Sequence, residues 1–176
     1  MTKEMMSKKQ RASQSERIQE KYEKMRTEYW PEVSEDELWH RKRQTGFCTV
    51  PRTLPLICRI LDELSPGKPT SNTYISLWCR VYDTSIVVIN APIDLAYEAG
   101  FSGQRATSAW LARMKILKKL EFIDSREGAS GEFHYVLIFN PHMVIKKIKN
   151  DGSFRSAHLT ALYERALNIG AVDYAS

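Results

Sequence analysis

The sequence predicts an α+β fold that is mainly helical, with one small antiparallel β-hairpin and flanking helices. Apolar side chains recur at helical spacing in several segments, and short runs rich in β-branched and aromatic residues lie between and after these segments. The 176 residues are 43% hydrophobic. The chain can therefore bury a sizeable core, and wholesale disorder is excluded.

Charge is spread unevenly along the chain, whose net charge is +5. Residues 91–150 hold nine Lys and Arg against six Asp and Glu, whereas residues 151–176 hold two against three. A positive excess suits a polyanionic partner such as DNA, but one of this modest size does not identify the partner.

Several classes of protein are set aside by what the sequence lacks. No run of eighteen apolar residues is present, and the first ten residues lack the apolar segment of a secretory signal. Cys48, Cys58 and Cys79 are odd in number and widely spaced, which predicts reduced, mostly buried thiols in a cytoplasmic protein. The four histidines lack the spacing of a metal site, and no nucleophile, base and orienting group come together. We expect no enzymatic activity, metal, cofactor, membrane contact or small-molecule ligand.

Residues 1–45 are expected to form a charged arm, with eleven Lys and Arg and nine Asp and Glu. Its first dozen residues are expected to be disordered. Residues 15–26 carry a narrow apolar stripe at helical spacing, too thin to support a core alone, and Pro31 prevents its continuation. Residues 34–39 predict a short capped helix. The basic run at residues 40–43 is either a clamp on a phosphate backbone or a solvated face.

The globular domain is expected to span residues 46–150. Residues 54–64 predict an amphipathic helix, because leucine and isoleucine recur at i, i+3, i+7 and i+10. The prolines and glycine of residues 65–69 end it. Residues 71–82 predict a second helix with a broad apolar face, and the β-branched run at residues 86–89 predicts a strand.

Residues 92–120 have the spacing of a helix-turn-helix, although an ordinary helical hairpin is the alternative. Pro92 can open the first helix, Gly100 supplies a left-handed turn residue, and Ser102 can cap the second helix. The inward positions expected in the second helix are Ala106, Ala109 or Trp110, Met114, Leu117 and Leu120.

A β-hairpin is predicted after these helices. Residues 122–125 read as one strand, residues 126–132 as a loop with two glycines, and residues 133–139 as a second strand that stops at Pro141. We expect His134 on the surface of this hairpin.

Residues 71–140 resemble the winged helix-turn-helix domains of bacterial transcription regulators and plasmid replication proteins. The shared feature is the order helix, strand, helix, turn, helix and β-hairpin. In addition, LKKLEFI at residues 117–123 resembles the join between recognition helix and wing. Ala109-Trp110 departs from the branched aliphatic residue usual in the family, which leaves the phase of the second helix open by one residue.

The resemblance implies that residues 102–113 enter a DNA major groove and that the wing contacts the minor groove or the backbone. Arginine can bind guanine, glutamine can bind adenine, and hydroxyl groups can bond a base edge or a phosphate. A helix beginning at residues 102–103 would also offer free N–H groups to a phosphate. The DNA-binding residues expected from this placement are Ser102, Gln104, Arg105, Thr107, Ser108, Arg113 and Arg126.

Three related functions remain open at this point. The first is a sequence-specific, double-stranded DNA-binding regulator of transcription, and the second is a replication or maintenance factor of a plasmid or mobile element. The third is a winged helix used as a protein-interaction module, with the N-terminal arm as its docking segment.

Residues 151–176 predict a last helix, which Ser153 or Ser156 can cap and Gly170 can end. Its apolar stripe runs through Leu159, Leu162, Tyr163, Ala166 and Ile169. The stripe either folds back on residues 54–64 or pairs with a second chain. We expect the pairing, and therefore a homodimer, because sites read by such domains are commonly two-fold.

Overall fold

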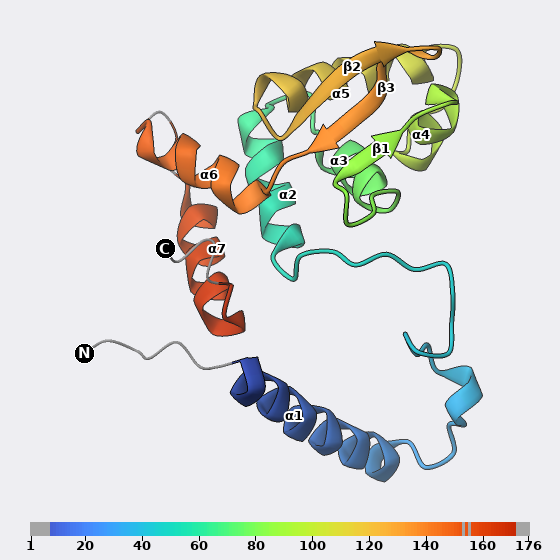
Figure 1. Ribbon diagram of the computed structural model, residues 1–176, viewed down its shortest axis with the longest axis vertical. Helices are drawn as coiled ribbons and strands as arrows, with labels where there is room; N and C mark the ends of the chain where they lie inside the picture. Colours follow the sequence, from blue (N-terminus) through green and yellow to red (C-terminus); the bar gives the residue numbers. More distant parts are fainter. Residues whose placement is uncertain (1–7, 153, 155, 172–176) are drawn as a thin grey trace. The chain divides into compact units, whose positions relative to one another are not determined.

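A computed structural model describes residues 8–152, 154 and 156–171 of the chain, and Figure 1 shows its elements. The contacts divide the chain into two units, Met1–Gly46 and Phe47–Ser176, and each is described by itself. In the described part, the fold is α+β, with seven α-helices and one small antiparallel sheet. The elements are α1 (Lys8–Tyr29), the 3-10 helix η1 (Glu35–Glu37), α2 (Leu54–Leu64), α3 (Ser71–Trp78), β1 (Ile86–Val88), α4 (Pro92–Glu98), α5 (Ala106–Lys119), β2 (Ile123–Gly128), β3 (Gly131–Ile138), α6 (Pro141–Asn150) and α7 (Ala157–Ile169).

The first unit is more helical than the sequence predicted. Helix α1 already begins at Lys8, so the expected disorder of residues 8–12 is wrong, and residues 1–7 lie outside the described part. The residues concerned are lysine, glutamine, arginine and alanine, all good helix formers. The helix ends at Tyr29, before Pro31, as expected.

A single turn, η1, replaces the short helix expected to reach Trp39. Ser34 caps this turn, because its backbone N–H and its hydroxyl both donate to Glu37 Oε2, at 2.9 and 3.0 Å. Leu38 is extended and ends the turn. The two hydrogen bonds of Ser34 also lower the pKa of the Glu37 carboxyl from its ordinary value.

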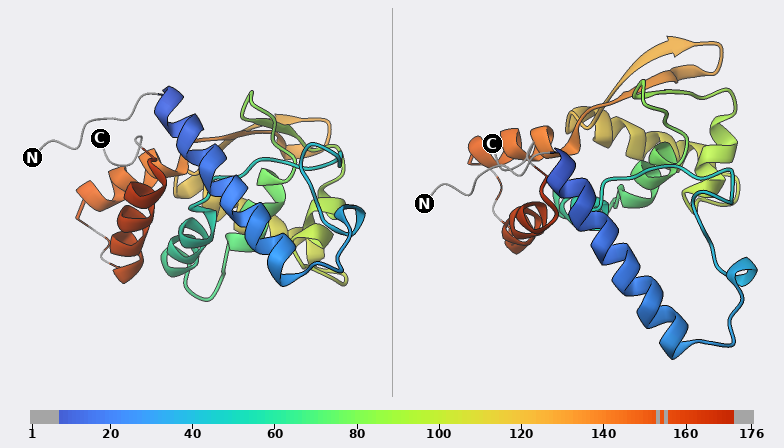
Figure 2. Two further views of the ribbon diagram at one scale, coloured as in Figure 1. Left: turned by 90° about the horizontal axis from the view of Figure 1, so that it is seen from below. Right: turned by 60° about the horizontal axis from the view of Figure 1, so that its bottom comes forward.

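In the second unit, a sheet with strand order β1-β3-β2 has helices on one of its faces (Figure 2). Ile86 pairs with Leu137 on one side of β3, and Ser125 pairs with Val136 on the other. The inward side chains join the apolar faces of the helices in one core. Trp110 of α5 is fully buried, and its ring meets that of Phe133 edge to face, with centroids 6.4 Å apart.

Three predicted elements differ from those in the structure. Helix α3 ends at Trp78, not Tyr82, because the chain turns there to enter β1: Arg80 N–H bonds Leu77 O in a tight turn, and Ser85 takes a left-handed φ of 60°. Helix α6 was not predicted at all. Asn140 caps it by accepting a hydrogen bond from the His142 N–H, directly before Pro141.

The hairpin loop is shorter than predicted, since residues 126–128 belong to β2 and Gly131 begins β3. The glycines lie at the strand ends, where Gly128 pairs with Gly131, and only residues 129–130 connect the strands. The expected surface position of His134 is wrong as well. His134 lies on the same face of β3 as the buried Val136 and Ile138, and it is buried with them.

His134 is held by the end of the hairpin. Its Nδ1 atom lies 2.8 Å from Ser130 Oγ and 3.1 Å from Ile89 O. A Cβ atom added to Gly128 would come within 2.3 Å of the His134 ring. Glycine at position 128 therefore makes room for the imidazole, which in turn connects the hairpin to the residue after β1.

Asp62, near the end of α2, caps the start of α3. Its carboxylate accepts hydrogen bonds from the backbone N–H of Thr70 at 2.8 Å and of Ser71 at 2.9 Å, and from the Ser71 hydroxyl at 2.7 Å. The carboxylate of one helix thus satisfies backbone N–H groups at the start of the next helix.

Helix α7 packs against α2 within the same unit. The Ser156 hydroxyl accepts from the His158 N–H at 3.0 Å, and Gly170 ends the helix with a φ of 69°. Ser153, the other predicted cap, lies outside the described residues. Leu159, Leu162 and Ala166 are buried against the core. This is the fold-back alternative, so the stripe no longer supplies a reason for a homodimer.

Two leucines of α7 test this packing. Leu162 is 0% exposed and Leu167 is 51% exposed. We expect Leu162→Ala to lower the free energy of unfolding by about 3 kcal/mol, because it leaves a cavity, and Leu167→Ala to lower it by less than about 0.5 kcal/mol. Chemical denaturation monitored by circular dichroism measures both. Equal effects of the two variants would contradict the burial of Leu162.

Candidate nucleic-acid interface

A turn built on two glycines joins α4 to α5. Gly100 has a φ of 87°, and the Phe101 N–H bonds Ala96 O at 2.9 Å. Gly103, with a φ of 78°, adds a second turn before α5 begins. The predicted cap at Ser102 is therefore wrong: Arg105 is the N-cap residue, and α5 starts at Ala106. Residues 102–103 consequently present no helix N-terminus to a phosphate.

Helix α5 has one buried face and one open face. Its buried side chains are Ala106, Trp110, Met114 and Leu117, which settles the phase in favour of Trp110. On the opposite side, five residues recur at i, i+3, i+7, i+10 and i+14 and form one line along the helix. This line, here termed the α5 stripe, consists of Arg105, Ser108, Ala112, Lys115 and Lys119.

The α5 stripe has cationic side chains at both ends and small side chains in the middle. Ser108 and Ala112 separate Arg105 from the two lysines, and the Ser108 hydroxyl donates to Arg105 O at 2.9 Å. Lys115 lies 3.7 Å from Glu132, but both side chains are about half exposed or more, so the pair is weak. Within the described part of the chain, Arg105 and Lys119 have no ion pair.

The structure brings some of the predicted site residues together. Gln104, Arg105 and Ser108 are exposed at the start of α5, beside the exposed Ser102. Thr107 is half-buried on the flank of the helix. These five residues lie in the α4–α5 loop and in the first helical turn of α5, close enough together for a single ligand to contact them.

Arg113 has a different surrounding from the one predicted. Its guanidinium carbon lies 5.4 Å from the centroid of the Phe101 ring, and its Nε donates to Pro69 O at 3.4 Å. The side chain is half-buried. These contacts connect α5 to the α4–α5 turn and to the segment before α3, so Arg113 has a structural role.

Arg126 lies on the outward face of the sheet, away from the α5 stripe. It is part of β2, opposite Tyr135, and its Nη1 lies 2.7 Å from Asp124 Oδ2. The pKa of the Asp124 carboxyl is lowered, first by the hydrogen bond from the Ser125 N–H and then by Arg126 and the nearby Lys118 ammonium. The Arg126 side chain is 76% exposed, so this pair is weak and leaves the guanidinium accessible.

Sequence reasoning missed Lys115 and Lys119. The predicted contact segment stopped at residue 113, two residues before the first of these lysines. Lys115 and Lys119 follow Ser108 by seven and eleven residues, which is helical spacing. Extending that spacing beyond residue 113 would have placed both lysines on the same helix face as Ser108.

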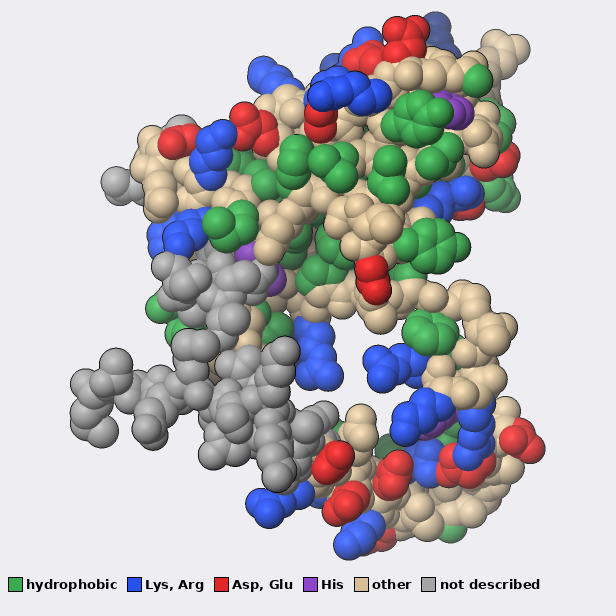
Figure 3. Space-filling model, in the orientation of Figure 1, with side chains coloured by type: hydrophobic (Ala, Val, Ile, Leu, Met, Phe, Trp, Pro, Cys, Tyr) green, Lys and Arg blue, Asp and Glu red, His purple; other side chains and the backbone are tan. Residues whose placement is uncertain are grey.

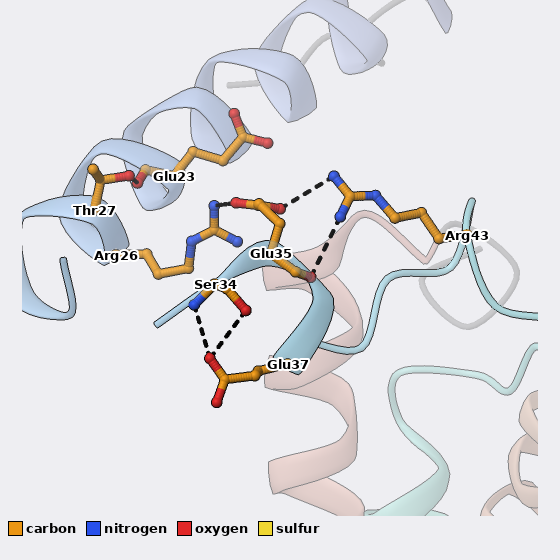
Figure 4. Close-up of polar contacts among 7 residues, drawn as sticks. All are labelled: Glu23, Arg26, Thr27, Ser34, Glu35, Glu37 and Arg43. Carbon is orange, nitrogen blue, oxygen red and sulfur yellow. Dashed lines mark hydrogen bonds and ion pairs between the residues drawn. The ribbon is translucent and has the colours of Figure 1, made fainter. Parts of the chain in front are cut away.

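The basic run at residues 40–43 belongs to the first unit, where Arg43 bonds the same residue as Arg26 (Figure 4). Arg43 Nη2 lies 3.3 Å from Glu35 Oε2, and Arg43 Nη1 donates to Glu35 O at 3.3 Å, while Arg26 bonds Glu35 Oε1. Two of the cations of this unit are thus partly neutralised by Glu35.

The cysteines are free, but they are not uniformly buried. Cys58 is buried, and its burial raises the pKa of its thiol to about 12. Cys48 is half-buried and Cys79 is exposed, so the burial predicted for all three fits only Cys58. Among the described residues, no three His, Cys, Asp or Glu side chains gather as metal ligands, and no helix is long and apolar enough to cross a bilayer.

Comparison of the chain with protein-family models, with curated proteins and with solved structures gives no match.

Arg105 and Arg113 are two arginines with different surroundings: Arg105 is exposed, and Arg113 contacts Phe101 and Pro69. Substituting each by alanine tests whether only Arg113 contributes to stability. We expect Arg113→Ala to lower the free energy of unfolding by about 1 kcal/mol, because it removes the contacts with Phe101 and Pro69. Arg105→Ala should change that free energy by less than about 0.5 kcal/mol. Urea denaturation checks both values. If Arg105→Ala proves the more destabilising, the assignment of the two roles is wrong.

Proposed function

We propose that residues 71–140 form a winged helix-turn-helix domain that binds double-stranded DNA in a sequence-specific manner, as a regulator of transcription. The observation that carries this proposal is the α5 stripe, an open helix face with cations at both ends and small residues between them. The turn between α4 and α5 adds Ser102 and Gln104 to this surface.

The order of elements supports the proposal. Helices α3, α4 and α5 with strands β1, β2 and β3 follow the sequence order of a winged helix, in which α5 would be the recognition helix and β2–β3 the wing. The burial of Trp110 fixes α5 on the core, so its opposite face is free for a ligand.

The dimensions and chemistry of α5 suit a major groove. Its 14 residues make it about 21 Å long, and the major groove is about 12 Å wide, which admits one helix. Ser108 and Ala112 allow the helix backbone to approach the base edges. Arg105 can bond guanine with two hydrogen bonds, while Lys115 and Lys119 can neutralise phosphates.

A replication or maintenance factor of a plasmid would use the same surface. The two functions differ in the arrangement of their DNA sites: an inverted repeat beside the protein's own gene favours the regulator, and direct repeats at an origin favour the replication factor. Selection of bound duplexes from a random pool reveals both the sequence preference and the symmetry of the site.

Binding to duplex DNA is expected to weaken steeply with salt. Neutralisation of about 4–6 phosphates predicts a slope of about −4 to −5 for log K against log salt concentration. Fluorescence anisotropy of a labelled duplex across a salt series measures the slope. Weak, sequence-independent binding even at low salt would falsify the regulator hypothesis.

Variants of the α5 stripe should separate base contacts from phosphate contacts. Arg105→Ala is expected to cost about 1–3 kcal/mol at one base position, whereas Lys119→Ala should weaken all sequences alike and reduce the magnitude of the salt slope by about 1. If the hairpin contacts only the backbone, Arg126→Ala should also weaken all sequences about equally. The control is Arg59→Ala, an exposed arginine on α2. The α5 assignment fails if the Arg59 variant loses as much affinity as the Arg105 and Lys119 variants.

A further inference from the structure

The outward face of the sheet is apolar and open. Six large apolar side chains on β1, on β3, directly after β3 and at the start of α6 are each between 40% and 52% exposed. Figure 3 shows apolar side chains gathered over the strands on the face turned toward the viewer. This apolar sheet face consists of Ile86, Val88, Tyr135, Leu137, Phe139 and Met143.

The strand register makes this face continuous. Ile86 pairs with Leu137, and Val88 pairs with Tyr135, so four of the side chains are direct cross-strand neighbours on one side of the sheet. On the other side of β3, Leu137 is opposite Asp124 and Tyr135 is opposite Arg126. The face is therefore apolar over β1 and β3 and has one ion pair over β2.

The size of the apolar sheet face matches the centre of an ordinary protein interface. Six large side chains at this exposure present roughly 400–600 Å² of apolar surface, the upper end of what monomeric proteins leave open. A standard interface buries about 800 Å² per partner, of which about 60% is apolar. The exposed area is thus close to the apolar share of one such interface.

We propose that the apolar sheet face is a dimerisation surface and that its occupant is the same face of a second copy of this chain. A sheet face has the shape that another sheet face packs against, because the two share the same twist. The charge also permits self-association. Asp124 and Arg126 neutralise each other at 2.7 Å, so two copies do not repel across this face although the whole chain is positive.

A hollow of about 600 Å³ adjoins the face at the start of α6. Phe139, Met143 and Val144 line it together with Ile123, and the ion pair between Lys147 and Glu121 lies at its polar side. A two-fold interface brings the same surface from both partners, so projecting side chains need a recess in the same patch. The apolar sheet face and this hollow supply both.

This surface differs from the one predicted for dimerisation from the sequence, which was the apolar stripe of α7. It is also a poorer site for DNA than the α5 stripe, because most of its exposed surface is apolar. The inference does not depend on the proposed DNA binding, and it is tested in the absence of DNA.

Sedimentation equilibrium of the full chain, up to about 100 µM, measures the dimer directly, since interfaces of this size bind at micromolar Kd or tighter. Leu137→Lys and Val88→Lys, on different strands, would each place a charge in the interface, and we expect each to raise the dimer Kd at least about tenfold. The matched control is Leu167→Lys, which changes an equally exposed leucine on α7. It should leave the Kd unchanged.

Thermal unfolding followed by circular dichroism shows that each variant is folded before its Kd is compared. A wild-type chain that remains monomeric throughout this concentration range overturns the proposal. Loss of the dimer in Leu167→Lys with retention in Leu137→Lys and Val88→Lys overturns it as well and assigns dimerisation to α7.

Discussion

The burial of Trp110 is the constraint on which the geometry of α5 depends. The indole is fully enclosed and meets Phe133 of the central strand, so the rotation of the helix about its axis is fixed by the largest side chain it carries. If Ala109 faced inward instead, the helix would turn by about 100° and the α5 stripe would no longer point away from the core. One aromatic contact inside the molecule thus decides which side chains a ligand can meet outside it.

The sequence predicted those parts of the fold that follow from local periodicity and local caps. Helix α2 ends at the predicted residue, α4 begins at Pro92, and Gly170 ends α7. These features depend on side chains within one or two turns of each other. The sequence also left the phase of α5 open between Ala109 and Trp110, because only the contact with Phe133, more than twenty residues away, distinguishes them.

What the sequence did not predict depends on contacts between distant segments. The alternation of β3 places His134 on the buried face with Val136 and Ile138, but its contact with the carbonyl of Ile89, 45 residues away, follows from no local pattern. Helix α5 starts later than predicted because Gly103 takes a left-handed φ. The sequence did not indicate this, because Ser102 is also a common helix-capping residue. The predicted contact segment ended at residue 113, so it did not include Lys115 and Lys119, which lie on the same helix face as Arg105.

The position of Arg113 has a consequence for how this sequence can change over generations. Its guanidinium packs on the Phe101 ring and bonds the Pro69 carbonyl. A substitution at position 113 would therefore remove contacts that hold the α4–α5 turn. Arg105 has no such tie. Related sequences should therefore keep positions 101 and 113 together as a pair, while position 105 is free to diverge. Positions only a few residues apart would then be conserved for different reasons, with the turn retained and the exposed start of α5 left variable.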